Sequence, residues 1–336
     1  MHRAGPMTRR KGAVVLGATG HVGQAIVREL LARGFRVTAA TRQHAAPSLA
    51  GLKVRVAQGD ADAPGQFNRW IEGHDIVVDA AAPHPLSIYV PDGREEQDPV
   101  TYARHRTRAM LDAVARHGAR LVFIGSFTTL PRHDTGLAAI EARMRRTVYP
   151  YFDVKRMMEN MVLDAAHAGL PALILNPSAF LGPGDSKPED SSFARMVMAR
   201  RLPVTMSHVI NVIDVRDVAA NVCAALAARR YGVRIPLAGH DIAVDDLARR
   251  IATLAGVAPP GMSSSTRVAA IAAFWGEFAL SMAGRAAPHA LRAVPLIADA
   301  GPMEHSTEQR ALGVRIRPLD ETLRDTVHWH LANDAH

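Results

Sequence analysis

The chain has 336 residues, of which 48% are hydrophobic and 21% charged, and its formal net charge is +8. This length and composition fit an ordinary globular protein with a substantial core. The arginines that dominate the charge are scattered, with no aromatic-interleaved basic stripe and no zinc-ligand spacing, so we expect no nucleic-acid partner.

Targeting, redox and metal signals are equally sparse. No signal peptide or integral membrane segment is predicted, because no apolar run of suitable length follows the basic N-terminus. The single cysteine, Cys223, excludes an internal disulfide, suits a reducing compartment and is expected in the core. None of the 16 histidines stands at metal-ligand spacing, so no metal is predicted. We therefore expect a cytoplasmic protein.

Three glycines, Gly17, Gly20 and Gly23, lie between a short apolar run and a helix-periodic segment near the N-terminus. Residues 13–16 predict a strand and residues 24–31 an amphipathic helix. Glycine is needed where a chain turns sharply off a strand, approaches a pyrophosphate and packs the next helix closely. The pattern predicts a dinucleotide site at the helix N-terminus, although a tight turn without a ligand has the same pattern.

Short apolar runs alternate with longer periodic segments along the chain. Further strands are predicted at residues 36–40, 53–57, 75–80, 120–125, 170–175 and 209–213. Such alternation is typical of right-handed βαβ units. We predict an α/β protein with a Rossmann-type doubly wound parallel sheet and a smaller, mostly helical C-terminal substrate domain.

The expected dinucleotide-binding domain spans residues 12–178, with 209–236 returning to it, and the expected substrate-binding domain spans 179–208 and 237–332. Asp214 and Asp217 are expected to fix a helix start near the junction of the two. The apolar segment 268–284 is interrupted by Glu277 and is short for a membrane span. We expect it to form a core or pocket-lid helix.

Tyr151 and Lys155 are four residues apart and therefore lie on one face of the helix predicted at residues 151–168. A lysine ammonium beside a phenol favours the phenolate and lowers its pKa from about 10, which suits a general acid or base near neutrality. The spacing alone is common by chance. The Tyr151–Lys155 pair becomes a stronger candidate for a catalytic site because Ser126 follows a predicted strand. That strand ends at the sheet edge where a nicotinamide would lie.

With these motifs in order, the chain resembles the extended short-chain dehydrogenase/reductase family, also called the NAD-dependent epimerase/dehydratase family. The resemblance runs over nearly the whole length. Besides the glycine turn, Ser126 and the Tyr151–Lys155 pair, it is carried by residues 59–60, 80–82, 176–178, 182–185, 211–219, 308–313 and 323–329. Within the family the chain is most similar to the dihydroflavonol reductase-like and hopanoid-associated sugar epimerase-like branch.

The resemblance implies a hydride-transfer site. Tyr151 would exchange a proton with a substrate hydroxyl or carbonyl, Ser126 would hydrogen-bond the same oxygen, and Lys155 would hold the nicotinamide ribose. The residues implied at the cofactor are Gly17, Thr19, Gly20, His21, Val22, Gly23, Arg42, Asp60, Ala61, Ala80, Ala81, Ala82, Lys155, Pro177 and Ser178. Those implied at the substrate are Ser126, Phe127, Thr128, His84 and Phe180. A homodimer through the helices that carry Thr107 and Tyr151 is a further implication.

The end of the second predicted strand bears on cofactor choice. An NAD preference usually needs a carboxylate there to accept the ribose hydroxyls, whereas the 2′-phosphate of NADP needs a cation. Residues 38–43 contain no acid and include Arg42. We therefore expect NADP(H) to be preferred over NAD(H), unless Arg42 is only a solvent-facing loop residue.

Two departures from the family narrow the prediction. Ala103 stands where the family usually has an asparagine that positions the active-site lysine or a water. Ala179 stands where members acting on sugar nucleotides typically have an asparagine that contacts the pyrophosphate, which argues against such a substrate. An apolar pocket is expected instead from Phe127, Phe180, Leu181, Met196 and Met198, although such residues are also typical of a core.

The leading hypothesis is an NADP-dependent oxidoreductase with Tyr151 as acid/base. It would reduce a ketone or aldehyde, or oxidise the alcohol, on a hydrophobic small molecule of secondary or lipid metabolism. A second hypothesis is a sugar or nucleotide-sugar epimerase or dehydratase, in which the cofactor is reduced and reoxidised within one turnover. A third is a non-catalytic NADP-sensing regulator, although such relatives commonly lack the Tyr-x-x-x-Lys pair that this chain retains.

Overall fold

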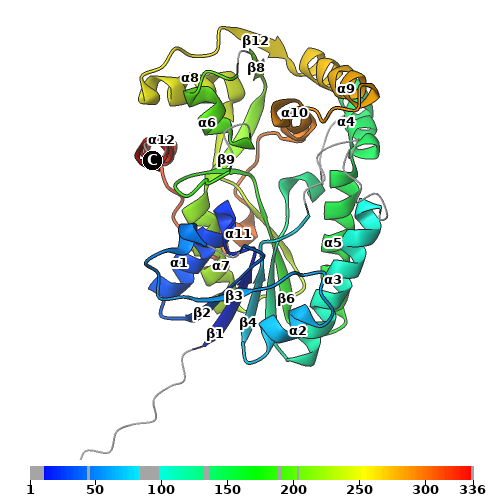
Figure 1. Cartoon of the computed structure of the whole chain (residues 1–336), viewed down its shortest axis with the longest axis vertical. Helices are drawn as coiled ribbons and strands as arrows, with labels where there is room; N and C mark the ends of the chain where they lie inside the picture. The colour runs from blue at the N-terminus through cyan, green and yellow to red at the C-terminus, as the bar shows by residue number, and fades with distance from the viewer. Residues whose placement is uncertain are drawn as a thin grey trace, which may run out of the picture.

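A seven-stranded parallel sheet forms the centre of the lower part of the molecule in Figure 1. The computed structural model describes residues 11–43, 46–83, 98–131, 136–187, 191–202 and 204–333. The strands of this sheet are β1 (Gly12–Leu16), β2 (Arg36–Thr41), β3 (Arg55–Gln58), β4 (Ile76–Asp79), β5 (Arg120–Ile124), β6 (Ala172–Pro177) and β10 (Arg234–Leu237). Their order is β10-β6-β5-β4-β1-β2-β3. Because the order reverses between β1 and β4, where doubly wound sheets bind their ligands, the predicted Rossmann-type fold is confirmed.

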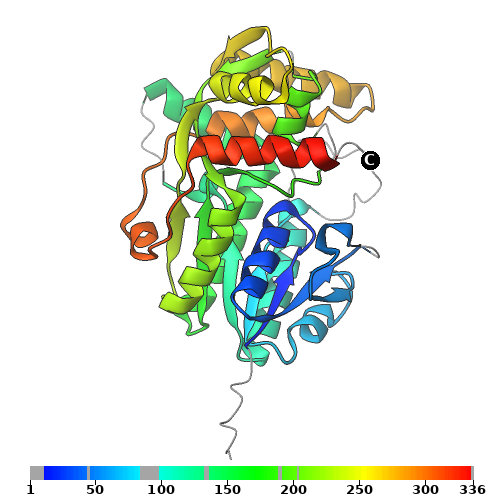
Figure 2. The ribbon, with the colours of Figure 1, turned by 90° about the vertical axis from the view of Figure 1, so that its left-hand side faces the viewer.

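Helices cover both faces of this sheet. They are α1 (His21–Ala32), α2 (Gln66–Ile71), α3 (Pro99–Arg116), α5 (Pro150–His167) and α7 (Val215–Ala228). α1 and α7 cover the face that is turned toward the viewer in Figure 2, and α2, α3 and α5 cover the opposite face. Side chains along β1 point alternately into these two cores and all are buried, which is why the strand is apolar at nearly every position. Cys223 is buried in the core beneath α7, as predicted.

The remaining elements lie mostly above the sheet in Figure 1. They are the 3₁₀ turns η1 (Pro47–Leu49) and η2 (Phe127–Thr129), the strands β7 (Ala179–Leu181), β8 (Val204–Ser207), β9 (Val209–Asp214), β11 (His240–Ala243) and β12 (Met262–Ser265), and the helices α4 (Gly136–Val148), α6 (Phe193–Met198), α8 (Val244–Ala255), α9 (Thr266–Met282), α10 (His289–Asp299), α11 (Thr307–Ala311) and α12 (Leu319–Asn333). The strands form two small sheets, β11-β9-β7 and β12-β8. Of these five strands only β9, which has six residues, was predicted; the other four have three or four residues each, and their sequences include polar residues such as those of Met262–Ser265.

The apolar segment that was expected to be a core or pocket-lid helix forms α9, and the core prediction is wrong. Within α9 only Ala273 and Glu277 are buried. The large apolar side chains Val268, Ile271, Trp275, Phe278 and Met282 are exposed. α9 packs on α10 at the upper edge of the molecule, so its other side faces outward (Figure 1). In the described part of the chain, no helix combines the length and apolar content needed to cross a membrane.

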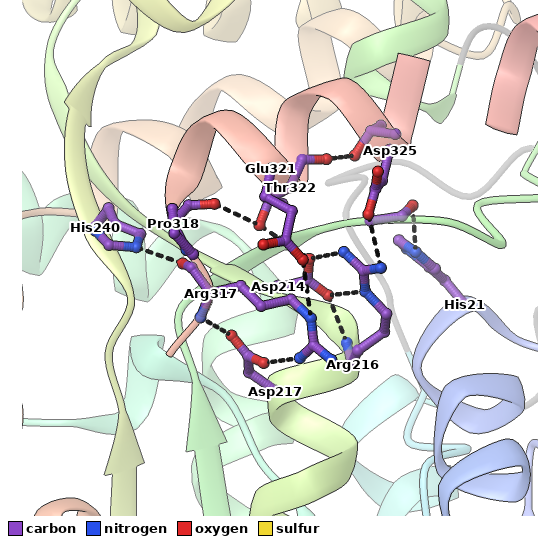
Figure 3. Close-up of polar contacts among 12 residues, drawn as sticks. His21, Asp214, Arg216, Asp217, His240, Arg317, Pro318, Glu321, Thr322 and Asp325 are labelled. Carbon is purple, nitrogen blue, oxygen red and sulfur yellow. Dashed lines mark hydrogen bonds and ion pairs between the residues drawn. The ribbon is translucent and has the colours of Figure 1, made fainter. Parts of the chain in front are cut away.

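A polar network joins the C-terminal helix α12, and the residues just before it, to the start of α7 (Figure 3). Asp214 accepts a hydrogen bond from the backbone N–H of Arg216 at 2.8 Å and so caps α7, as predicted. Thr322 of α12 donates its hydroxyl to the same carboxylate at 2.9 Å. Asp217, one turn further along α7, accepts hydrogen bonds from the backbone and the guanidinium of Arg317.

Candidate active site

In the glycine turn after β1, backbone segments pass one another too closely for side chains to fit between them. Gly17 has a φ of +71°, and a Cβ there would lie 2.9 Å from the carbonyl oxygen of Ala80 and from the Cβ of Ala81. A Cβ on Gly23 would overlap the carbonyl oxygen of Gly17, so only glycine lets α1 pack this close to the end of β1. Gly20 caps α1 without a side chain in front of the helix.

The N-terminus of α1 fits the pyrophosphate of a dinucleotide. Its first turn, which begins with His21, Val22 and Gly23, contains no acidic residue. The N–H groups of a first turn have no partner within the helix, and the helix dipole places partial positive charge there. The glycine turn leaves a space that a Cβ would fill, and the helix N-terminus follows it directly. These residues therefore fit the pyrophosphate of NAD(P).

Ser126, Tyr151 and Lys155 come together at the carboxyl end of β5. Oγ of Ser126 lies 3.1 Å from Oη of Tyr151 and 2.9 Å from Oγ1 of Thr128, so three hydroxyls form one hydrogen-bonded chain. Nζ of Lys155 lies over the Tyr151 ring, 5.7 Å from its centroid. Both side chains are 3% exposed and occupy consecutive turns of α5. The arrangement can present two hydroxyls to a single substrate oxygen.

Burial dominates the protonation of this group. It raises the pKa of Tyr151 to about 12, and the hydrogen bonds from Ser126 and Thr128 oppose it only in part. This direction is opposite to the one expected from the Tyr–Lys spacing, because the phenolate loses water and the ammonium lies over the ring. Burial lowers the pKa of Lys155 to about 8, although the negative charge of Glu159 opposes that change.

A buried carboxylate, Glu159, supports the site from below. Its Oε1 accepts hydrogen bonds from the backbone N–H of Ser126 at 3.0 Å and from Nδ2 of Asn176 at 2.9 Å. Its Oε2 accepts a hydrogen bond from the Thr129 hydroxyl at 2.7 Å and lies 3.2 Å from Nε of Arg234. Burial raises the pKa of Glu159, against the hydrogen bonds that stabilise its ionised form. The carboxylate therefore joins α5 to the ends of β5 and β6.

A buried ion pair fixes the turn after β4. Both terminal nitrogens of Arg106 donate to the carboxylate of Asp79, each at 2.9 Å. The same carboxylate accepts a hydrogen bond from the backbone N–H of Ala81 at 3.0 Å. Of the residues 80–82 that were expected beneath the cofactor, Ala80 and Ala81 are thereby held beside Gly17.

Three residues of the site, Glu159, Asp79 and Arg106, were not predicted from the sequence. The available signal for Glu159 was its position four residues after Lys155, on the same face of α5. Nothing in the sequence pairs Asp79 with Arg106, because their contact depends on how α3 lies across the sheet. Ala103 of α3 is fully buried in the core beneath that helix, so the position of the expected family asparagine carries no polar side chain.

The adenosine edge of the expected site lies at the ends of β2 and β3. Thr41 and Gln58 are register partners there, so Arg42 and Asp60 follow neighbouring strand ends. Oγ1 of Thr19 lies 3.2 Å from Oγ1 of Thr41 and ties the glycine turn to this edge. Arg42 and Asp60 are exposed, and Ala61 is half-buried beside them. A cation thus stands at the edge where a 2′-phosphate would need one.

The side chain of His21 is buried and makes its contacts with other residues of the protein. Its Nε2 lies 3.1 Å from the carbonyl oxygen of Gly182, and its ring packs edge-on against Phe180 at 5.5 Å between centroids (Figure 3 shows His21). Burial lowers its pKa to about 4, although the charge of Asp185 opposes that change. The side chain therefore connects the glycine turn to the 182–185 turn, and Phe180 lies against His21.

The other expected residues are placed as follows. Pro177 and Ser178 are buried at the end of β6, next to the strand that Ser126 follows. Phe127 packs against the core of the upper part of the molecule, and Thr128 joins the hydroxyl chain. His84 lies outside the described residues. Within the described ranges, no three His, Cys, Asp or Glu side chains gather in a way that could hold a metal ion.

Comparison with known proteins agrees with this geometry. A sequence model of the NAD dependent epimerase/dehydratase family matches residues 13–235, which include the glycine turn, Ser126 and the Tyr151–Lys155 pair. The chain belongs to that family. Its members are NAD(P)-dependent oxidoreductases and epimerases, so this protein is an enzyme of that class.

Individual relatives match most of the chain. A putative dihydroflavonol 4-reductase from Synechocystis sp. is 26% identical over 94% of this chain and 93% of the relative. Sterol demethylase protein B from Methylococcus capsulatus is 28% identical over 76% of this chain and 78% of the relative. The crystal structure of a nucleoside-diphosphate-sugar epimerase from Pseudomonas aeruginosa superposes with a TM-score of 0.74 at 23% identity, covering 97% of this chain and 99% of that one, which shows a shared fold.

Gly23→Ala tests the close packing of the glycine turn. Because the added methyl group overlaps the Gly17 carbonyl, we expect the free energy of unfolding to fall by about 2–3 kcal/mol. Urea unfolding measures this. Gly261→Ala is the matched control, since Gly261 has no atom within 4 Å of an added Cβ, and it should change stability by less than about 0.5 kcal/mol. Equal effects of the two substitutions would contradict the packing argument.

Proposed function

We propose that the protein is an NADP(H)-dependent oxidoreductase that reduces a ketone or aldehyde, or oxidises the corresponding alcohol, on an apolar small molecule. The proposal is carried by the 3.1 Å contact between the hydroxyls of Ser126 and Tyr151, with Lys155 over the phenol ring. Two hydroxyls this close can donate to one carbonyl oxygen and polarise it. Bound NADPH supplies the hydride to the carbonyl carbon.

Tyr151 delivers the proton in this proposal. A pKa of about 12 keeps the phenol protonated at neutral pH, as a general acid requires. Once the substrate oxygen gains negative charge, the phenol gives up its proton. The hydrogen bond from Ser126 and the ammonium of Lys155 then stabilise the phenolate.

An apolar substrate is supported by two observations. Ala179 stands where sugar-nucleotide enzymes of the family typically have a pyrophosphate-binding asparagine, and it starts β7 without a polar side chain. The names of two relatives, dihydroflavonol 4-reductase and sterol demethylase protein B, refer to multi-ring compounds rather than to sugar nucleotides. NADP(H) is favoured over NAD(H) by the exposed Arg42 after β2 and by the lack of a carboxylate in residues 38–43.

Tyr151→Phe tests the role of the phenol. Removal of the proton donor should lower kcat/KM for carbonyl reduction by about 10²-fold or more, while NADPH still binds, because the ring remains in place. Steady-state kinetics and a fluorescence titration of NADPH measure the two quantities. Tyr149→Phe is the matched control, since Tyr149 is similarly buried in the same cluster but has no lysine four residues on. An active Tyr151→Phe protein would refute the assignment.

Arg42→Ala tests cofactor choice. Loss of one charge-assisted hydrogen bond should weaken NADPH binding about tenfold, and NADH binding should stay within about twofold of the wild type. Isothermal titration with each nucleotide measures the difference. Arg55→Ala removes an exposed arginine from the opposite end of β3 and should change neither affinity. An equal loss of affinity for NADPH and NADH would show that Arg42 does not bind the 2′-phosphate.

The lowered pKa of Lys155 predicts a pH dependence. Below pH 8 the ammonium is present and stabilises the Tyr151 phenolate, whereas above about pH 8 it is lost and the reduction rate falls. Tyr151 stays protonated through this range, so the fall reports Lys155. Single-turnover rates are measured between pH 6 and pH 10, at intervals of about one pH unit, and give the pH profile of the reduction. Lys155→Arg should move the fall to higher pH, and an unchanged profile would contradict the assignment.

A further inference from the structure

The outward face of α9 has an unusual composition. Its five exposed apolar side chains, Val268, Ile271, Trp275, Phe278 and Met282, recur at intervals of three and four residues and therefore form one stripe. The buried side of the helix carries Ala273 and Glu277 instead. A helix at the surface of a water-soluble protein normally has the reverse arrangement, with its apolar stripe turned to the core.

Neighbouring α4 carries a second outward stripe. Ile140, Met144 and Val148 are exposed and lie four residues apart on one face. Nε of Arg267, at the start of α9, lies 2.6 Å from Oε1 of Glu141 in α4, so the two helices are joined at this edge. Figure 1 shows α9 and α4 on the same side of the molecule. We name these eight apolar residues, each 41–75% exposed, the α4/α9 face.

The exposed charged side chains on the two helices of this face, and on the segment after α9, have one sign. Along the described side chains of α4, α9 and residues 283–288, the exposed charged groups are Arg143, Arg267 and Arg285, all of them cationic. The acidic Glu141 is half-buried and pairs with Arg267, and Glu277 is buried. An apolar stripe next to exposed cations complements the acyl region and the anionic headgroups of a lipid bilayer.

A second copy of the chain fits this face less well. A twofold contact would bring the same arginines close to one another, and like charges repel across an interface. Trp275 also suits a bilayer surface, because the amphipathic indole prefers the headgroup level. We propose that the α4/α9 face docks on an anionic lipid membrane, with α9 lying in the plane of the interface.

The docking surface is connected to the candidate active site. α10 lies between the two, and its Leu296 packs against the cluster that contains Tyr149 and Tyr151. Nη2 of Arg146 in α4 pairs with Oδ2 of Asp299 in α10 at 3.1 Å. Membrane docking would therefore bring the wall beside Tyr151 close to the lipid. The docking itself rests on the surface alone and stands whether or not the proposed reductase activity does.

The test is co-sedimentation of the full chain with phosphatidylglycerol/phosphatidylcholine vesicles at low salt. The wild-type protein should bind these vesicles, and bind much less to vesicles of phosphatidylcholine alone. The double substitution Trp275→Ser and Phe278→Ser should lower the partition coefficient about tenfold or more. Leu254→Ser with Leu331→Ser removes two apolar side chains that are 42% and 50% exposed elsewhere on the surface, and it should leave binding unchanged. Thermal unfolding confirms that each variant is folded.

Two further variants sharpen the outcome. Arg143→Glu with Arg285→Glu should abolish binding to the anionic vesicles, and Trp275→Phe should keep binding while removing the vesicle-induced blue shift of the fluorescence. Absence of wild-type binding, or equal binding by the Trp275→Ser and Phe278→Ser variant, would overturn the proposal. A dimer that this double substitution converts to a monomer, without vesicle binding, would overturn it in favour of a second copy. Reduction of a water-soluble carbonyl compound, measured in parallel without vesicles, reports the proposed function separately.

Discussion

The geometry of the candidate site depends on one buried carboxylate. Glu159 binds the backbone N–H of Ser126, the amide of Asn176 and the hydroxyl of Thr129. A Cβ on Gly125 would overlap this carboxylate, so the chain passes directly over it. Since Lys155 and Tyr151 lie one and two turns before Glu159 on the same helix, the bonds that hold Glu159 also set their distance from Ser126. Because burial removes water from the Glu159 carboxylate, its place in the structure depends on these donors.

The cofactor side of the site is held by packing and by a second buried charge pair. The Gly17 turn lies against Ala80 and Ala81, and Asp79 holds that segment through its bonds to Ala81 and Arg106. Both supports converge on the carboxyl ends of β1 and β4, where the strand order reverses. The nucleotide cradle and the hydroxyl chain are thus fixed independently, one by α1 and β4, the other by α5 and β6.

The parts that sequence reasoning predicted have local signatures. The glycine spacing, the strand before Ser126 and the four-residue interval from Tyr151 to Lys155 each follow from backbone geometry within a few residues. The Asp79–Arg106 pair joins residues 27 apart, so it needed the sheet order and the path of α3. The direction of the Tyr151 pKa shift needed the depth of burial, which spacing does not give. The exposure of α9 was missed because apolar composition does not reveal which neighbours cover a helix.

The central claim is that Ser126, Tyr151 and Lys155 support net carbonyl reduction. The most direct measurement is the stoichiometry of NADPH oxidised to product formed, followed by absorbance and by mass spectrometry across a panel of apolar ketones and aldehydes. The account predicts one NADPH consumed for each alcohol formed. Conversion of a substrate to an isomer with no net change in NADPH would instead assign the site to epimerisation and contradict it. Tight NADPH binding without turnover of any carbonyl or sugar would contradict it in favour of a nucleotide-sensing protein.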